Sequence, residues 1–184
     1  MVSRNALARA LKALLDHGFR FTVIGGTVVE YALGKEDLGD DVDLFAEHPS
    51  PVFDEGEYRR FAEELGWSYG QTWLGTPRIV ASVGEEVPIE FYENLYDFYV
   101  PEKVLEGSVR VEIGEIKVKM VTLEHYLLLK ANSGRGVDMD RLAEIAKLVK
   151  RGRLALDVRK VEEGARSFDE GEVLLRRLRE VSLL

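Results

Sequence analysis

The side chains of this chain that could do chemistry gather between residues 21 and 47. Asp41 and Asp43 flank Val42 in a stretch of otherwise apolar residues. Side chains on a β-strand alternate between its two faces. The two carboxylates are therefore predicted to share one face of a strand at about 41–46, while Val42 and Leu44 point into a core. Carboxylate oxygens are the ligands that Mg²⁺ prefers, and the ion commonly takes one or two of them.

A glycine turn comes before the carboxylate pair. Gly25, Gly26 and Thr27 follow an apolar stretch that predicts a strand at 21–24, and a helix is expected at about 28–33. Backbone N–H groups and a hydroxyl at the start of a helix can hold an anion. The glycines could also serve a close-packed turn in which a Cβ would clash. A phosphate-binding turn beside two carboxylates is what metal-dependent phosphoryl or nucleotidyl transfer requires.

The order of strand, Gly25-Gly26, short helix and Asp-x-Asp strand, with Asp41 placed 15 residues after Gly26, resembles the polymerase-beta-like nucleotidyltransferase fold. It is most similar to the small prokaryotic branch with the minimal nucleotidyltransferases and the AbiEii-like toxins, over about residues 20–145. The resemblance implies that Asp41 and Asp43 bind the metal ions that bridge the nucleotide phosphates. It also implies that Gly25, Gly26 and Thr27 bind the triphosphate.

The family has a third acid on a later strand, and Glu90 is the candidate for it here. Ile89 and Phe91 are expected to face the core, so that Glu90 points to the opposite face of its strand. The resemblance implies that Glu90 is a third metal ligand and helps to activate an acceptor hydroxyl. Glu93 is a competing candidate, and a plain exposed hairpin position is the structural alternative for Glu90.

A second segment, at 116–145, resembles the AbiEii-like branch through Lys130, Arg135 and Asp138. The sequence departs from that branch at Val137, where lysine is usual, and at Arg141, where a second aspartate is usual. Lys130 is expected to contact a nucleotide phosphate as a point charge. The alternative is a lysine that offsets the macrodipole at the end of its helix.

Alternation of aromatic residues predicts a strand at 67–74, with Trp67, Tyr69 and Trp73 on one face. Packing in the core or at a sheet edge is one interpretation of these rings. Stacking against a nucleotide base is the other.

The composition restricts the class of protein. The chain has 184 residues, 46% of them hydrophobic, and no apolar run approaches the ~20 residues of a transmembrane helix. The first 18 residues resemble a charged amphipathic helix more than a signal peptide, so we expect a cytoplasmic protein without a membrane partner. The lack of cysteine excludes disulfides, thiolate zinc sites and a cysteine nucleophile. Few amide side chains and 32% charged residues suggest a thermophilic source.

Charge is distributed unevenly. The net charge is −8, which comes from −10 in residues 1–100 and +2 in residues 101–184. An acidic surface does not attract nucleic acid as a whole. The mildly basic second half could meet a polyanion, or could be a set of solvated helix faces.

The order of predicted elements indicates an α/β (α+β) fold with a mixed sheet flanked by helices. We expect a nucleotidyltransferase core at 1–120 and a helical C-terminal part at 121–184 packed on it. The resulting hypothesis is a Mg²⁺- or Mn²⁺-dependent transfer of NMP from an NTP to an acceptor hydroxyl of a protein, a tRNA or a small molecule. The alternatives are a non-catalytic nucleotide-binding or toxin–antitoxin partner protein of the same fold, and a metal-dependent phosphohydrolase.

Overall fold

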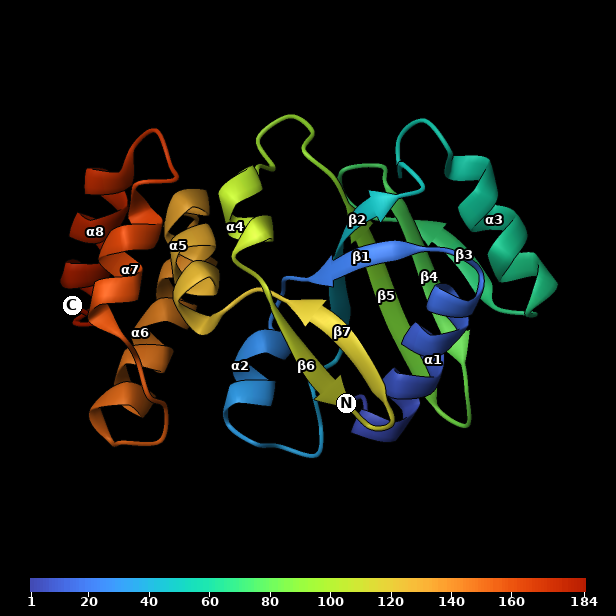
Figure 1. Cartoon of the computed structure of the whole chain (residues 1–184), viewed down its shortest axis with the longest axis horizontal. Coiled ribbons are helices and arrows are strands. Elements are labelled where there is room, and N and C mark those ends of the chain that lie inside the picture. Colours follow the sequence, from blue (N-terminus) through green and yellow to red (C-terminus); the bar gives the residue numbers. More distant parts are fainter.

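Seven strands form one mixed sheet in the order β3-β4-β5-β2-β1-β7-β6 (Figure 1). The computed structural model describes residues 1–184. The strands are β1 Arg20–Val23, β2 Val42–His48, β3 Ser68–Gln71, β4 Pro77–Ser82, β5 Glu86–Tyr92, β6 Val109–Ile113 and β7 Ile116–Met120. The helices are α1 Arg4–Asp16, α2 Thr27–Ala32, α3 Glu55–Glu64, α4 Glu102–Glu106, α5 Leu123–Ser133, α6 Gly136–Lys150, α7 Val158–Ala165 and α8 Gly171–Glu180. The predicted fold class is confirmed.

The centre of the sheet brings together strands that are distant in the sequence. β2 pairs antiparallel with β1 and parallel with β5, and β1 pairs parallel with β7. β3, β4 and β5 form an antiparallel meander at one edge, and β6 and β7 form a hairpin at the other. The parallel pair of β2 and β5 places Asp43 directly opposite Glu90.

One face of the sheet is packed under helices. Tyr58 of α3 packs against Phe91 of β5 with ring centroids 4.8 Å apart, and His17, just after α1, contacts Phe61 of α3. Neighbouring residues on a strand point to opposite faces. Glu90 therefore lies on the face of the sheet opposite to Tyr58 and Phe91, as the alternation predicts.

The helices α5 to α8 lie together beside the sheet, at the left in Figure 1. Gly164 of α7 permits close packing on α5, because a Cβ there would lie 2.8 Å from Leu128. Arg177 of α8 donates to the carbonyl of Ala131 at 2.6 Å, so that α8 satisfies a free carbonyl near the end of α5. The apolar core is one continuous cluster of 48 buried residues that extends from the sheet into these helices.

Several predicted boundaries were wrong. The aromatic strand predicted at 67–74 ends at Gln71, and Trp73 lies in the turn that follows. The helix predicted from the sequence at 123–131 is longer, because α5 continues to Ser133 and ends at Gly134, whose φ of 63° is the left-handed conformation that glycine adopts readily. Helix α7, which has eight residues and is rich in charged side chains, was not predicted from the sequence. No helix combines the length and the apolar character needed to cross a membrane.

Candidate active site

Asp41 and Asp43 lie at the start of β2, on one face of the sheet. Asp43 is the second residue of β2, and Asp41 is the residue just before this strand begins. Val42 and Leu44, on the other face, are fully buried. Asp43 is partly buried and Asp41 is exposed, so the pair reaches from the floor of the site to the solvent.

Glu90 joins this face from the neighbouring strand, since it stands opposite Asp43 in the β2–β5 pair. Glu93, the competing acid, lies beyond the end of β5. Its carboxylate accepts from the Ser50 hydroxyl at 2.8 Å and from the Val52 N–H at 2.9 Å. Glu93 thus stabilises the loop after β2, and Glu90 is the acid that shares the aspartates' face.

The negative charges of Asp41, Asp43 and Glu90 are close enough together to affect the pKa of both aspartates. Burial, and then the charges of Asp41 and Glu90, raise the pKa of Asp43 to about 7, although Lys130 opposes the shift. Burial and the charge of Glu90 also raise the pKa of Asp41. Like charges held close together favour the protonated form or a bound cation. The aspartate pair is therefore suited to a divalent ion at neutral pH.

Glu90 is held by two other side chains. The Arg78 Nε lies 3.3 Å from its Oε1, and the Tyr92 hydroxyl donates to its Oε2. No group of three acidic or histidine side chains is arranged to hold one metal ion. The residues fit an ion that takes Asp41 and Asp43 and completes its shell with water and phosphate oxygens. The role of Glu90 as a metal ligand stays a prediction.

Gly25 is the glycine that the site requires. A Cβ at position 25 would overlap the carboxylate of Asp43, whereas a Cβ at Gly26 would meet nothing within 4 Å. The N–H groups of Gly25 and Gly26 donate to no backbone carbonyl. Gly25 is therefore close-packed, as the structural alternative predicts, and the binding of phosphate by the Gly25 and Gly26 N–H groups stays a prediction.

Thr27 does not present its hydroxyl to the site. The residue is fully buried, and its Oγ1 has no hydrogen-bond partner. As the first residue of α2, it turns its side chain into the core. The hydroxyl is therefore not exposed to the cavity in this structure, and the role of Thr27 in binding the triphosphate stays a prediction.

A cavity of about 460 Å³ opens beside Asp43 and Gly25. Its other walls come from the turn after β3, the segment between β5 and α4, and the end of α5 with the loop after it. The residues that line it are Ile24, Gly25, Asp43, Trp73, Asp97, Phe98, Tyr99, Val100, Tyr126, Leu129, Lys130, Asn132, Ser133 and Arg135.

Lys130 lines this cavity from the last turn of α5, so its position fits both interpretations made from the sequence. Its Nζ lies 2.9 Å from Oδ1 of Asp138, a residue only 3% exposed. Ser133 donates to the other carboxylate oxygen at 2.6 Å, and so does the Arg135 Nε at 2.8 Å. Burial alone would raise the pKa of Asp138, but the hydrogen bonds from Arg135, Ser133 and Lys130 lower it. Asp138 thus holds two cations at the wall of the cavity.

Arg78 and Tyr92 were not predicted from the sequence to belong to the site. Arg78 lies opposite Glu90 in the β4–β5 pair, and Tyr92 is two residues beyond Glu90 on β5. Arg78 meets Glu90 because of the register of the β4–β5 pair, which no local pattern in the sequence sets. Strand alternation puts Tyr92 on the same face as Glu90.

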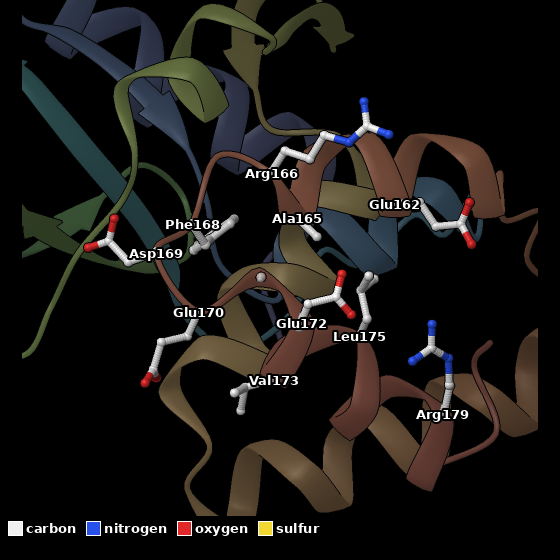
Figure 2. A pocket seen from close by; sticks show the side chains of 11 residues that line it. Glu162, Ala165, Arg166, Phe168, Asp169, Glu170, Glu172, Val173, Leu175 and Arg179 are labelled. Atoms are coloured by element: carbon white, nitrogen blue, oxygen red, sulfur yellow. The ribbon is translucent and has the colours of Figure 1, made fainter.

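A larger cavity, of about 520 Å³, lies between α7 and α8 (Figure 2). Glu162, Asp169 and Glu170 contribute carboxylates to its rim, but their charged ends point in different directions in Figure 2. A binding site needs polar groups that converge on a ligand. The smaller cavity beside Asp43 is therefore the candidate active site.

The fold is that of a nucleotidyltransferase. The crystal structure of an antigenic nucleotidyltransferase-like protein from Paracoccidioides brasiliensis superimposes with a TM-score of 0.59 and 14% identity, over 99% of this chain and 89% of that chain. A family model described as "Nucleotidyl transferase of unknown function (DUF2204)" matches residues 3–180. The chain belongs to this nucleotidyl transferase family, which confirms the predicted superfamily, whereas the AbiEii-like subtype stays a prediction.

Two structures of the antibiotic-resistance factor ANT(2'')-Ia are more distant. A solution structure has a TM-score of 0.47 and 16% identity, over 98% of this chain and 89% of that chain. A crystal structure in complex with adenylyl-2''-tobramycin has a TM-score of 0.47 and 17% identity, over 96% and 97%. A search of curated proteins gives no match.

Proposed function

We propose that this nucleotidyltransferase moves a nucleoside monophosphate from an NTP to an acceptor hydroxyl and depends on Mg²⁺ or Mn²⁺. The observation that supports this most directly is the packing of the Asp43 carboxylate against Gly25, with Asp41 on the same face and a cavity alongside. Negative carboxylates and free backbone donors meet at one point, as a metal-bound triphosphate requires.

Each group has a defined task in this proposal. Asp41 and Asp43 hold the metal, and the N–H groups of Gly25 and Gly26 donate to phosphate oxygens. Lys130 adds a positive charge at the cavity wall. The bound ion would neutralise charge on the triphosphate and the leaving pyrophosphate.

The transfer itself is a displacement at the α-phosphorus. The acceptor oxygen forms a bond to this phosphorus, the bond to the bridging oxygen of the β-phosphate breaks, and pyrophosphate leaves with the electron pair. Glu90 takes the proton of the acceptor hydroxyl. The acceptor is a protein side chain, a tRNA end or a small molecule.

The test measures the binding of each NTP by calorimetry, with and without Mg²⁺, to the wild type and to the Asp41→Asn/Asp43→Asn variant. We expect metal-dependent binding in the wild type and its loss in the variant. Equal affinity of both proteins in the presence of Mg²⁺ would refute the site. Transfer is then assayed with α-labelled NTP over a broad acceptor screen. A wild type that binds Mg·NTP but labels no acceptor would be a nucleotide-binding module instead.

A further inference from the structure

The structure separates the three aromatic residues that the sequence placed on one face. Trp67 packs edge-on against Phe61, with ring centroids 5.4 Å apart. Tyr69 donates to Glu55 at 2.6 Å, outside the candidate site. Of these three residues, only Trp73 lines the cavity beside Asp43. It is 68% exposed, so it contributes little to the core.

The guanidinium of Arg135 lies over the ring of Trp73, although the two residues are far apart in the sequence. The guanidinium carbon lies 5.8 Å from the centre of the indole ring. Trp73 belongs to the turn between β3 and β4, and Arg135 to the loop between α5 and α6. Indole rings and guanidinium planes are both surfaces on which nucleic-acid bases stack. Asp138 holds the Arg135 Nε at 2.8 Å and thereby orients this plane.

One face of the indole is free for a ligand. The Arg135 guanidinium lies over the ring on one side. Because most of the Trp73 side chain is exposed, the face away from Arg135 is available for stacking.

We propose that Trp73 is the surface on which the nucleobase stacks, and that the preferred substrate is a purine nucleoside triphosphate. This inference rests on the proposed function, because Gly25 and Asp43, which would hold the triphosphate, line the same cavity. The cavity of about 460 Å³ lies in the size range of small-molecule sites. A purine covers more of the indole than a pyrimidine does, and stacking strength sets the modest base preferences of such surfaces.

The experiment compares a ligand that has a base with one that has none. Binding of Mg·ATP, Mg·GTP, Mg·CTP, Mg·UTP and Mg·tripolyphosphate is measured for the wild type, Trp73→Ala and Trp73→Phe. Trp73→Ala should raise the Kd for Mg·ATP about tenfold, as loss of a stacking ring does, and leave the Kd for Mg·tripolyphosphate within about twofold. Trp73→Phe keeps a ring and should stay within about threefold of the wild type for Mg·ATP. The wild type should prefer purines, and Trp73→Ala should lose this preference.

Fluorescence gives a second readout, because the chain has two tryptophans. The control variant Trp67→Phe leaves Trp73 as the single indole, and Mg·ATP should quench its emission. In Trp73→Phe the remaining emission should not respond.

Unchanged Mg·ATP affinity in Trp73→Ala would overturn the proposal, and so would an equal loss of Mg·tripolyphosphate affinity or an unquenched Trp67→Phe variant. These results leave the proposed function standing, provided that the wild type binds Mg·NTP through Asp41 and Asp43. A wild type that binds neither Mg·ATP nor Mg·tripolyphosphate would refute the proposed function and this inference together.

Discussion

Gly25 and Asp43 share a space that admits only one side chain. A Cβ on Gly25 would overlap the Asp43 carboxylate. The Ile24 N–H donates to the Asp43 carbonyl at 3.0 Å, so β1 and β2 are tied together at this point and the backbone cannot easily separate. The absence of a side chain in the turn therefore sets the position of the carboxylate that faces the cavity.

Gly25→Ala should displace the Asp43 side chain and abolish metal-dependent NTP binding. Overpacking of this kind costs about 1–3 kcal/mol in the free energy of unfolding. Gly26→Ala is the matched control, since a Cβ there meets nothing and its φ of −56° suits any residue. Adding Asp43→Gly to Gly25→Ala removes the Asp43 Cβ as well as its carboxylate, so it should recover part of the lost stability without restoring binding. Chemical denaturation and calorimetry measure both effects, and normal Mg·NTP binding by Gly25→Ala would contradict the role given to this contact.

The second prediction concerns pH. The pKa of Asp43 is raised to about 7, so the folded protein holds this proton at a higher pH than the unfolded chain does. The contribution of this group to the free energy of unfolding therefore falls as the pH rises from about 4 to 7. The lowered pKa of His125 acts in the opposite direction. Because the two shifts oppose each other, the test compares the stability of Asp43→Asn with that of the wild type. Without metal, Asp43→Asn should become more stable than the wild type as the pH rises to 7.

Bound Mg²⁺ should reverse the loss of wild-type stability at higher pH, because the ion binds the ionised carboxylates. The Mg²⁺-induced rise in the melting temperature of the wild type should be larger at pH 8 than at pH 5.5, and Asp43→Asn should show little rise at either pH. Thermal unfolding in EDTA and in Mg²⁺ measures this. A rise independent of pH, or an undiminished rise in Asp43→Asn, would place the metal elsewhere.

Glu90→Gln should separate transfer from binding. Mg·NTP affinity should stay within about threefold, since the aspartates and the glycine turn hold the nucleotide. Transfer, or self-labelling, should fall about a hundredfold or more, as expected for loss of a general base. Glu93→Gln is the control and should retain transfer, because Glu93 accepts hydrogen bonds from Ser50 and Val52 outside the site. The opposite pattern in the two variants would assign the catalytic role to Glu93.

Thr27→Val tests whether the buried hydroxyl of Thr27 takes part in nucleotide binding. The hydroxyl is buried without a partner, which costs about 1–3 kcal/mol in folding free energy. The valine variant should therefore be at least as stable as the wild type, and its Mg·NTP affinity should be unchanged. Denaturation and calorimetry measure the two quantities. A large loss of affinity would show that the threonine hydroxyl reaches the nucleotide after all.

What the sequence by itself determined is local. The shared face of Asp41 and Asp43, the outward direction of Glu90 and the strand–turn–helix around Gly25 follow from side-chain periodicity and turn chemistry, which covalent geometry imposes within a few residues. These features were predicted without the fold. The register that sets Asp43 opposite Glu90 was not, because β2 and β5 are separated by two other strands in the sequence.

Only the tertiary structure decided which predicted residues meet. It turned Thr27 inward, held Glu90 between Arg78 and Tyr92, and placed Trp73 at the cavity after β3 ended at Gln71. These outcomes depend on contacts between segments far apart in the chain. The free energy of such contacts comes from packing and burial of the whole core, and no local pattern of residues records it.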